Sequence, residues 1–368
     1  MNILILNWRD PKNPKSGGAE IVTLEHAKAW VKAGNKVTWF TSEFKIKDER
    51  SKTNEKVDGI NIVRKGTFIT VFLHAFFYYL FSGEKFDLVI DEIHGLPFFT
   101  PLYARNVRKI AFIHEVADEI WDYMYPFPIN LIGRKVEKIL LLPYKNIKFI
   151  TVSNSTKNDL IKNGIKETNI SVILNGINNK VLSELPLKEK NPTFIFVSRV
   201  VKMKGIEEVI KAFFYILRDI DNSQLWIVGD GEPSYVEELK EKMKSYSISP
   251  RVKFWGRVPN DKKLELMSRA HILLHASVKE GWGLVVIEAA SMATPSVVYN
   301  VSGLKDSVKN GKTGVVLAEN SAKEMAKQAI LLINDKKRYM EYQKNCLEWA
   351  KSLTWKKSNS QSLNLINI

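Results

Sequence analysis

One stretch of the sequence sets the architecture of the chain: residues 272–298 read ILLHASVKEGWGLVVIEAASMATPSVV. Its first residues form a short apolar run of the kind found in buried strands of parallel sheets. A loop punctuated by glycines follows and leads into an apolar helix, which Pro295 ends because proline cannot continue a helix. A second apolar run, from Ser296 to Tyr299, predicts another strand. The stretch is therefore a strand–loop–helix–strand unit of an α/β protein.

Two carboxylates flank the start of this predicted helix. Glu280 follows the first strand, and Glu288 lies eight positions later inside the helix. Ligands of open α/β sheets bind outside the carboxyl ends of the strands. A phosphate could bind the free N–H groups of Gly283 and Leu284, and Gly281 would let the backbone approach it closely. An isolated pair of glutamates at this spacing is more often an ordinary turn with two solvated side chains.

The amino-terminal stretch offers a second anion site. An apolar strand from Met1 to Asn7 leads into a loop with Gly17 and Gly18, and a helix is predicted from Ala19 to Ala33. Glycines at a helix N-terminus invite an anion, although a flexible loop is an equally good interpretation. The full dinucleotide fingerprint Gly-x-Gly-x-x-Gly is missing, which argues against a nicotinamide enzyme.

Two histidines follow successive predicted strands. His94 comes after the strand 86–91, and His114 comes after the strand 109–113. A single histidine is more often structural than functional. Two at the carboxyl edge of one sheet are better candidates for a functional site. Neither has the spacing of a metal ligand set, so no metal site is predicted.

A pair of cations marks the start of the second half of the chain. Arg199 and Lys204 flank one loop between a predicted strand, 193–197, and a predicted helix, 206–217. Two fixed cations near a helix start would neutralise a diphosphate. The alternative is two unrelated surface charges.

These motifs together resemble glycosyltransferase family 4, the retaining enzymes of the GT-B fold, and the resemblance covers nearly the whole chain. It rests on the Glu-x7-Glu pair with Gly-Trp-Gly after its first glutamate, on Gly-Gly-Ala-Glu at 17–20 and on Arg-x4-Lys-Gly from Arg199. The resemblance implies two Rossmann-like doubly wound domains facing a cleft, with a C-terminal helix that crosses back to the first. We expect an acceptor-binding domain, a linker, a nucleotide-sugar-binding domain and a returning tail, at 1–183, 184–191, 192–350 and 351–368 respectively.

The resemblance also implies roles for individual residues. Arg199 and Lys204 would hold the donor diphosphate, Glu280 a sugar hydroxyl and Glu288 the ribose hydroxyls, while His114 would face the donor sugar. The remaining expected substrate contacts are Gly17, Gly18, Val258, Gly281, Trp282, Gly283 and Leu284. No metal or other cofactor is expected besides the nucleotide-sugar co-substrate.

One motif departs from the family pattern. The commoner Gly-Gly-x-x-Glu is changed at Ser302 and Asp306. Because this loop lies close to the donor in the family, the departure leaves the preference for the donor sugar and its base open.

The bulk composition fits this interpretation. With 368 residues the chain suits two domains, and its single cysteine fits a reducing compartment. We find no secretory signal and no apolar run of roughly 20 residues that could span a bilayer, and expect a cytoplasmic protein. The net charge of +15 is spread over both halves. It does not by itself mark a nucleic-acid face, and no nucleic-acid partner is expected.

Three functions remain open at this point. The first is transfer of a hexosyl or N-acetylhexosaminyl unit from a UDP- or GDP-sugar to a glycan or lipid-linked acceptor. The second is a nucleotide-sugar hydrolase or epimerase of the same fold. The third is a basic nucleotide- or RNA-binding protein without chemistry, which only the charge supports.

Two apolar segments bear on a membrane partner. The region 123–148 is amphipathic and basic, and it could lie peripherally on the anionic inner face of a membrane or pack on the core with a solvated edge. The aromatic stretch 68–81 is predicted to form a helix buried against the sheet. Contact of this stretch with lipid is the alternative.

Overall fold

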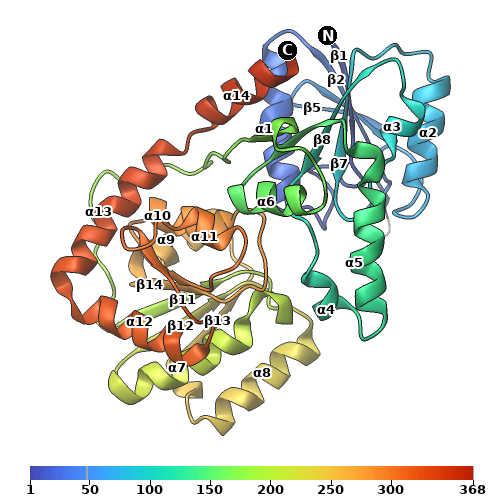
Figure 1. Cartoon of the computed structure of the whole chain (residues 1–368). Coiled ribbons are helices and arrows are strands. Elements are labelled where there is room, and N and C mark those ends of the chain that lie inside the picture. The colour runs from blue at the N-terminus through green and yellow to red at the C-terminus, as the bar shows by residue number, and fades with distance from the viewer. Residues whose placement is uncertain (47–48, 368) are drawn as a thin grey trace. The chain divides into compact units, whose positions relative to one another are not determined.

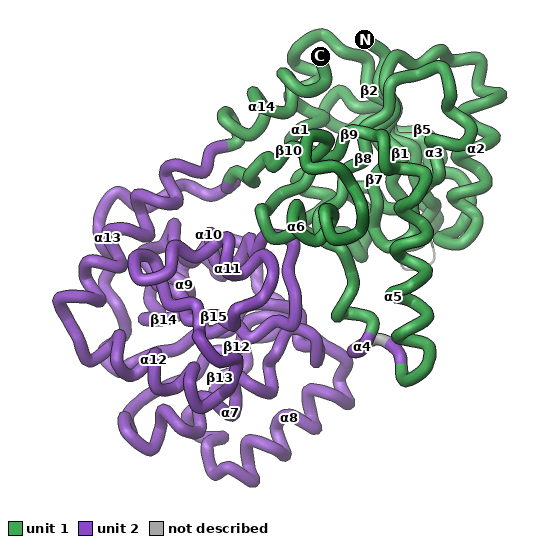
Figure 2. The backbone as a smooth tube through the Cα atoms, viewed as in Figure 1, with its two compact units in different colours: residues 1–121, 126–176, 355–368 green, residues 122–125, 177–354 purple. Residues whose placement is uncertain are grey.

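The computed structural model describes residues 1–46 and 49–367, and the chain divides into two compact units (Figures 1 and 2). Unit 1 comprises residues 1–121 and 126–176 together with the C-terminal segment that begins at Trp355. Unit 2 comprises residues 122–125 and 177–354.

Unit 1 is built on a sheet that has eight strands within the described residues. All neighbouring strands are parallel except the edge pair β5–β6, which is antiparallel. In spatial order the strands are β10 (Ile170–Val172), β9 (Lys148–Thr151), β8 (Arg108–Ile113), β7 (Leu88–Ile93), β1 (Asn2–Leu6), β2 (Lys36–Thr41), β6 (Ile60–Arg64) and β5 (Asn54–Val57). The short strands β3 (Lys45–Ile46) and β4 (Glu49–Arg50) pair outside this sheet.

Helices cover both faces of the unit 1 sheet. The strand order reverses its direction of growth at β1, and right-handed crossovers therefore place α1 on one face and α2, α3, α5 and α6 on the other. Figure 1 shows α1 with α14 on one side of the sheet and α2 with α3 on the other. The helices are α1 (Gly18–Lys32), α2 (Val71–Phe81), α3 (Thr100–Tyr103), α4 (Ile120–Met124), α5 (Ile129–Leu140), η1 (Leu142–Tyr144), α6 (Asn154–Lys162), η2 (Glu167–Asn169) and α14 (Trp355–Asn367).

Unit 2 is a second parallel α/β layer structure. In its described residues the sheet has six strands, in the order β13 (Val252–Gly256), β12 (Gln224–Val228), β11 (Thr193–Val197), β14 (Ile272–His275), β15 (Ser296–Val298) and β16 (Gly314–Val316). Separate apolar clusters pack on its two faces, as expected of a sheet buried on both sides. The helices are η3 (Lys202–Lys204), α7 (Ile206–Asp219), α8 (Pro233–Ser245), η4 (Ser249–Arg251), α9 (Asn260–Arg269), α10 (Leu284–Ser291), α11 (Leu304–Ser307), α12 (Ala322–Asn334) and α13 (Lys336–Ser352).

The predicted strand–loop–helix–strand unit is β14, α10 and β15, and the prediction of two Rossmann-like sheets is confirmed. The C-terminal segment does return to unit 1. There Ser362 of α14 accepts a hydrogen bond from the Trp30 indole of α1 at 2.7 Å. The expected tail 351–368 ends at Ile368, which lies outside the described residues.

The predicted linker differs from the structure. Apart from the short segment 122–125, the chain passes between the units after Gly176 and after Thr354, whereas residues 184–191 lie within unit 2. The backbone N–H of Glu189 donates to the carbonyl of Arg269 at 3.0 Å, and the ammonium of Lys188 donates to Thr294 at 2.8 Å. Charge and a proline suggested a hinge, but these side chains attach the segment to unit 2.

The expectation of a buried helix at 68–81 is wrong for one side of the helix, which is exposed. Helix α2 forms within this stretch, yet only Val71 and Ala75 of the helix are buried. A helix that is apolar all round can place only one side on a sheet. Among the described residues, none of the helices combines the length and apolar character needed to cross a membrane.

Candidate active site

The loop after β11 brings the two predicted cations to the carboxyl edge of the unit 2 sheet. The ammonium of Lys204 lies 2.6 Å from the carboxylate of Glu280, and both side chains are mostly buried. The Arg199 side chain is exposed, and the described part of the chain gives it no ion pair. One cation is therefore fixed, and the other remains available to an anion.

A glycine makes the close approach of this loop to the next strand possible. Gly205 has φ +71°, and a Cβ there would lie 2.0 Å from the carbonyl oxygen of Ala276. Only glycine fits this position, because any side chain would collide with backbone. The arrangement holds Lys204, one residue earlier, beside the segment that carries Glu280.

Glu280 is the centre of the charged group in unit 2. Besides Lys204, the His275 ring approaches it, with Nε2 3.2 Å from the carboxylate. Burial by itself would raise the pKa of Glu280, but the Lys204 ammonium and the contact with His275 outweigh it and hold this pKa below its usual range. The carboxylate is therefore an anion whose position two neighbours fix.

The loop 301–306, which departs from the family pattern, contacts the backbone of Glu280. The backbone N–H of Glu280 donates to the carbonyl of Ser302 at 3.1 Å. A Cβ on Gly303, where φ is +80°, would lie 2.1 Å from the carbonyl oxygen of Glu280. Asp306 accepts a hydrogen bond from the backbone N–H of Gly303 at 3.3 Å. Aspartate thus caps the short helix α11 where the family has glutamate.

The N-terminus of α10 lies on the same loop. Gly283 precedes the helix with φ +79°, and the ring of Trp282 is buried beneath it. The N–H groups of Leu284 and Val285 lie too early in α10 to pair within it, whereas Val286 N–H donates to the Gly283 carbonyl at 2.9 Å. The first two groups can therefore donate hydrogen bonds to an anion beside Gly281. The structure therefore brings Gly281, Trp282, Gly283 and Leu284 together with Glu280.

The other expected donor contacts lie elsewhere in unit 2. Glu288 forms an ion pair with Lys263 of α9, whose ammonium lies 2.7 Å from each carboxylate oxygen. A ribose hydroxyl would therefore meet a carboxylate that already has a partner. Val258 is half-buried and packs against the apolar cluster that includes Trp255.

The predicted anion site at the start of α1 is partly occupied by the protein itself. The backbone N–H of Gly17 donates to the carboxylate of Glu20 at 2.6 Å, and the Arg9 guanidinium lies 2.9 Å from that carboxylate. Gly17 and Gly18 are exposed. Glu20 completes the Gly-Gly-Ala-Glu motif and caps its own helix, which leaves the N–H of Gly18 for a ligand.

The two histidines at strand ends do come together. The rings of His94 and His114 lie 5.4 Å apart between centroids, and His114 Nε2 lies 3.4 Å from the carboxylate of Glu92. Thr23 of α1 donates its hydroxyl to the other oxygen of Glu92 at 2.5 Å. The structure thus confirms the prediction that both histidines share one edge of the sheet.

Burial governs the charges of this cluster. It lowers the pKa of both His94 and His114 to about 4, despite nearby carboxylates that act in the opposite direction. It raises the pKa of Glu92 to about 8, against the effects of His94 and Thr23. Near neutral pH both imidazoles are therefore uncharged, and Glu92 is largely protonated.

Residue spacing predicted no metal site, but this cluster does contain a group of possible metal ligands. Ligand atoms of Glu92, His94 and His114 lie within 4.8 Å of one another, a group that could hold a cation. Residue spacing did not predict this group, because Glu92 and His94 lie at the end of one strand and His114 at the end of another. The grouping comes only from the pairing of β7 with β8.

Several partners in these sites were not predicted from the sequence. His275, Lys263 and Glu92 contact predicted site residues across distances of 5 to 25 positions or between elements. His275 could have been found, because it ends the strand that leads to Glu280. Lys263 could not, because its approach depends on how α9 packs beside α10.

The fold and the site together define a glycosyltransferase of the GT-B type. The chain matches the model of glycosyltransferases family 4 over residues 16–181 and that of glycosyl transferases group 1 over residues 178–349. The two models together span nearly all of the chain, which therefore belongs to glycosyltransferase family 4.

Similar proteins agree with this assignment. N-acetyl-alpha-D-glucosaminyl L-malate synthase of Bacillus anthracis is 22% identical, with 95% of this chain and 92% of that protein aligned. Among solved structures, sucrose-phosphate synthase of Thermosynechococcus elongatus has a TM-score of 0.78 at 19% identity, covering 100% of this chain and 98% of that one. HepE of Anabaena, solved with UDP-glucose, has a TM-score of 0.75 at 17% identity, covering 100% and 99% respectively. At these identities the two structures show the fold alone.

Proposed function

We propose that the protein transfers a hexosyl or N-acetylhexosaminyl unit from a nucleotide-diphosphate sugar to a glycan or lipid-linked acceptor, with retention at the anomeric carbon. The observation that carries the proposal is the group formed by Lys204, Glu280 and the glycine-lined start of α10, with the exposed Arg199 on a neighbouring loop. It offers positive charge and free N–H groups where a diphosphate leaving group needs them. UDP-glucose bound to the related fold of HepE supports the same class of donor.

In this proposal unit 2 binds the donor and unit 1 the acceptor. Arg199, Lys204 and the N–H groups at Gly283 and Leu284 stabilise the charge that develops on the diphosphate. Glu280 holds a sugar hydroxyl. Because two neighbours already stabilise its anion, this carboxylate suits orientation of the donor better than nucleophilic attack.

The resemblance to the family suggests the supporting roles. Glu288, joined to Lys263, binds the ribose hydroxyls, and Val258 borders the nucleobase. Gly281 and Trp282 shape the loop around the donor. For unit 1, we propose that His114, Gly17 and Gly18 contact substrate. Incubation of the donor without an acceptor distinguishes transfer from hydrolysis or epimerisation by the products formed.

Binding of the donor can be tested by thermal unfolding. A nucleotide-sugar present at about 100 times its Kd stabilises the native chain by about 2.7 kcal/mol. We expect one of the UDP-, GDP- and ADP-sugars to raise the melting temperature by several degrees. Arg199→Ala should largely remove this shift, and Arg218→Ala, at an exposed position late in α7, should keep it. Equal shifts in both variants would contradict the assignment of Arg199 to the diphosphate.

We also propose that transfer needs no metal ion, because Arg199, Lys204 and the α10 N-terminus supply the positive charge. EDTA should leave the initial rate unchanged after removal of divalent cations. A rate that falls and then recovers with added Zn²⁺ or Mn²⁺ would contradict this. Glu92, His94 and His114 would then be the candidate ligands of the metal ion.

A lipid-linked acceptor would place the enzyme at a membrane, and we propose that α5 rests peripherally on an anionic membrane. Only Gly133 and Glu137 of α5 are buried, and Glu137 anchors the helix by accepting the backbone N–H of Ala117 at 2.7 Å. The opposite side combines apolar and basic residues, as in helices that lie in a lipid interface. Its exposed apolar residues are Ile129, Leu131, Ile132, Val136 and Ile139, and its exposed lysines are Lys135 and Lys138.

A further inference from the structure

Helix α2 has an exposed apolar face that does not pack on the core of unit 1. The helix reads VFLHAFFYYLF and contains no charged residue. Its outer positions follow the spacing of one helical face, and the segment before it adds two further apolar side chains. The exposed fractions are 59% for Phe68, 77% for Ile69, 57% for Leu73, 47% for Phe77, 46% for Leu80 and 75% for Phe81.

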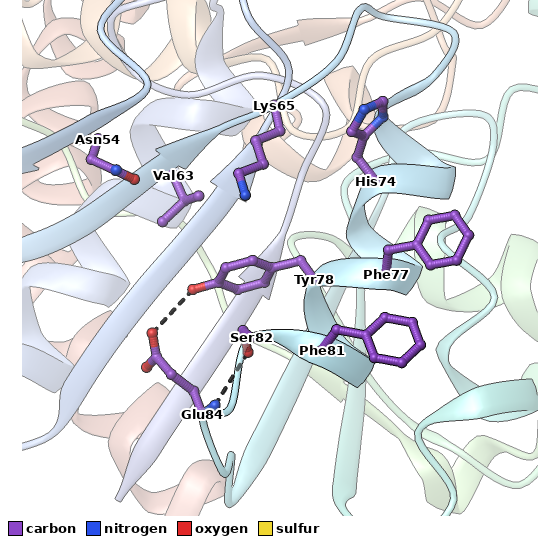
Figure 3. A pocket seen from close by; sticks show the side chains of 9 residues that line it. All are labelled: Asn54, Val63, Lys65, His74, Phe77, Tyr78, Phe81, Ser82 and Glu84. Atoms are coloured by element: carbon purple, nitrogen blue, oxygen red, sulfur yellow. Dashed lines mark hydrogen bonds between the residues drawn. The ribbon is translucent and has the colours of Figure 1, made fainter.

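The orientation of these side chains is visible in Figure 3. Tyr78 points toward the strands and donates its hydroxyl to Glu84 at 3.1 Å, whereas Phe77 and Phe81 point away from them. The rings of Phe77 and Phe81 stack with centroids 6.0 Å apart. A pocket of about 550 Å³ beside the helix is lined by Lys65 and Tyr78 and also by Phe77 and Phe81. The two phenylalanines therefore form the outer rim of α2 and contribute little to the core.

Soluble monomeric proteins rarely expose so many neighbouring large apolar side chains. Six large apolar side chains lie within fourteen residues, and each is worth about 1.5–3 kcal/mol when fully buried. Scattered exposed apolar residues need no explanation, but a contiguous cluster marks a surface that contacts another apolar phase.

Helices α2 and α5 lie over the same face of the unit 1 sheet, and buried contacts join the elements between them. The ring of Tyr103 in α3 packs against Phe76 and Tyr79 of α2, at 5.2 and 5.5 Å between centroids. Tyr144 of η1 and Thr100 of α3 both donate hydroxyl hydrogen bonds to the same carboxylate, that of Asp91. Helices α2 and α3 and the turn η1, which follows α5, are thus joined side by side.

Charge identifies the kind of partner. Arg105, which follows α3, is exposed, as are Lys135 and Lys138 of α5, while α2 carries no acid that an anionic surface would repel. Exposed apolar side chains on one helix and exposed cations on other helices of the same face match the surface of an anionic bilayer, where aromatic rings enter the boundary between headgroups and acyl chains. At 11 residues α2 is too short to span the roughly 30 Å hydrocarbon layer, so it would lie in the interface.

We propose that α2 is a second membrane-docking element, which inserts Phe77, Phe81 and their neighbours into an anionic lipid surface while α5 supplies the cations. The proposal rests on the membrane contact proposed above for α5. It adds that hydrophobic insertion, and not charge alone, holds unit 1 on lipid. Bound in this way, unit 1 would meet a lipid-linked acceptor at the membrane surface.

Sedimentation of the full chain with phosphatidylcholine–phosphatidylglycerol vesicles tests the proposal. Phe77→Ser/Phe81→Ser should weaken binding about tenfold or more, which corresponds to about 1.4 kcal/mol. The matched control is Leu331→Ser/Met340→Ser, which removes two apolar side chains of 49% and 50% exposure from unit 2 and should leave binding unchanged. Lys135→Gln/Lys138→Gln should also weaken binding, but this loss should vanish at high salt, where charge contributes little.

The outcomes separate the two membrane proposals. If the phenylalanine variant binds like the control while the lysine variant does not, α2 is not a docking element and the α5 contact stands. If neither variant differs from wild type, both fail. If wild type self-associates and Phe77→Ser/Phe81→Ser does not, with equal vesicle binding, the face pairs with a second copy and the lipid proposal is overturned.

Insertion can be observed directly with a dye. Cys346 is the single cysteine and is buried, so Phe81→Cys allows an environment-sensitive dye to be attached to α2 alone. Its emission should shift to the blue and brighten on addition of vesicles. A dye that stays in water while the chain sediments with vesicles would overturn insertion of α2. An unchanged thermal shift with the nucleotide-sugar confirms that the variants are folded.

Discussion

Lys204→Met is expected to lower kcat/KM about 10³-fold or more. Loss of one positive group that stabilises the leaving diphosphate costs about 10²–10³-fold in rate. The substitution also leaves the largely buried Glu280 without its cation at 2.6 Å, and an uncompensated buried charge costs about 3–5 kcal/mol. Glu280 would then move or take up a proton, which disturbs the donor site a second time. Steady-state kinetics with the donor identified by thermal unfolding measure the effect.

Lys202→Met is the matched control for this prediction. Lys202 lies two residues earlier on the same short helix, but its ammonium lies over the ring of Tyr235, 5.8 Å from the centroid. It carries the same charge and should change kcat/KM by less than about tenfold, because a cation–π contact at an exposed site is worth about 0.5–1 kcal/mol. Equal losses in both variants would mean that only the general positive potential matters and that the Lys204–Glu280 pair has no special role.

Gly303→Ala should both unfold the donor loop and abolish donor binding. A Cβ at this position would lie 2.1 Å from the carbonyl oxygen of Glu280, in a backbone conformation with φ +80° that side chains rarely adopt. Because the obstacle is backbone, no side chain can rotate away to relieve it. We expect the free energy of unfolding to fall by about 4 kcal/mol or more, as in other severe single substitutions.

Gly256→Ala separates the collision from the backbone strain. Gly256 also has a positive φ, +64°, but no atom lies within 4 Å of a Cβ built there. Its substitution should cost only about 1–2 kcal/mol, which is the strain of the left-handed conformation. Denaturant unfolding of the two variants measures the difference. Similar losses would show that Gly303 matters for its conformation alone and that the loop can move away from Glu280.

The parts of this molecule that local pattern determines could be predicted. Apolar runs predicted β1, β7, β8, β11, β14 and β15, and the glycines at 281 and 283 marked the loop before α10. Arg199, Lys204 and Glu280 came to one edge because the carboxyl ends of parallel strands share an edge. His94 and His114 met for the same reason.

What failed depends on packing between distant elements. Residues 184–191 look like a linker in composition, but Arg269 and Thr294 attach them to unit 2. The outer face of α2 looks like core because apolar content does not reveal how many sides of a helix are covered. The partners of Glu288 and His114 were missed because Lys263 and Glu92 approach them only in three dimensions.

The return of α14 to unit 1 has a consequence for the order of synthesis. Ile366 and Ser362 are buried, and Ser362 accepts the hydrogen bond of the Trp30 indole. Unit 1 therefore cannot be completed until the residues from Trp355 onward have been synthesised. Unit 2, whose residues all come earlier than Trp355, can be finished first. A chain that stops before Trp355 would contain every residue of unit 2 but would lack the helix that pairs with the Trp30 indole of unit 1.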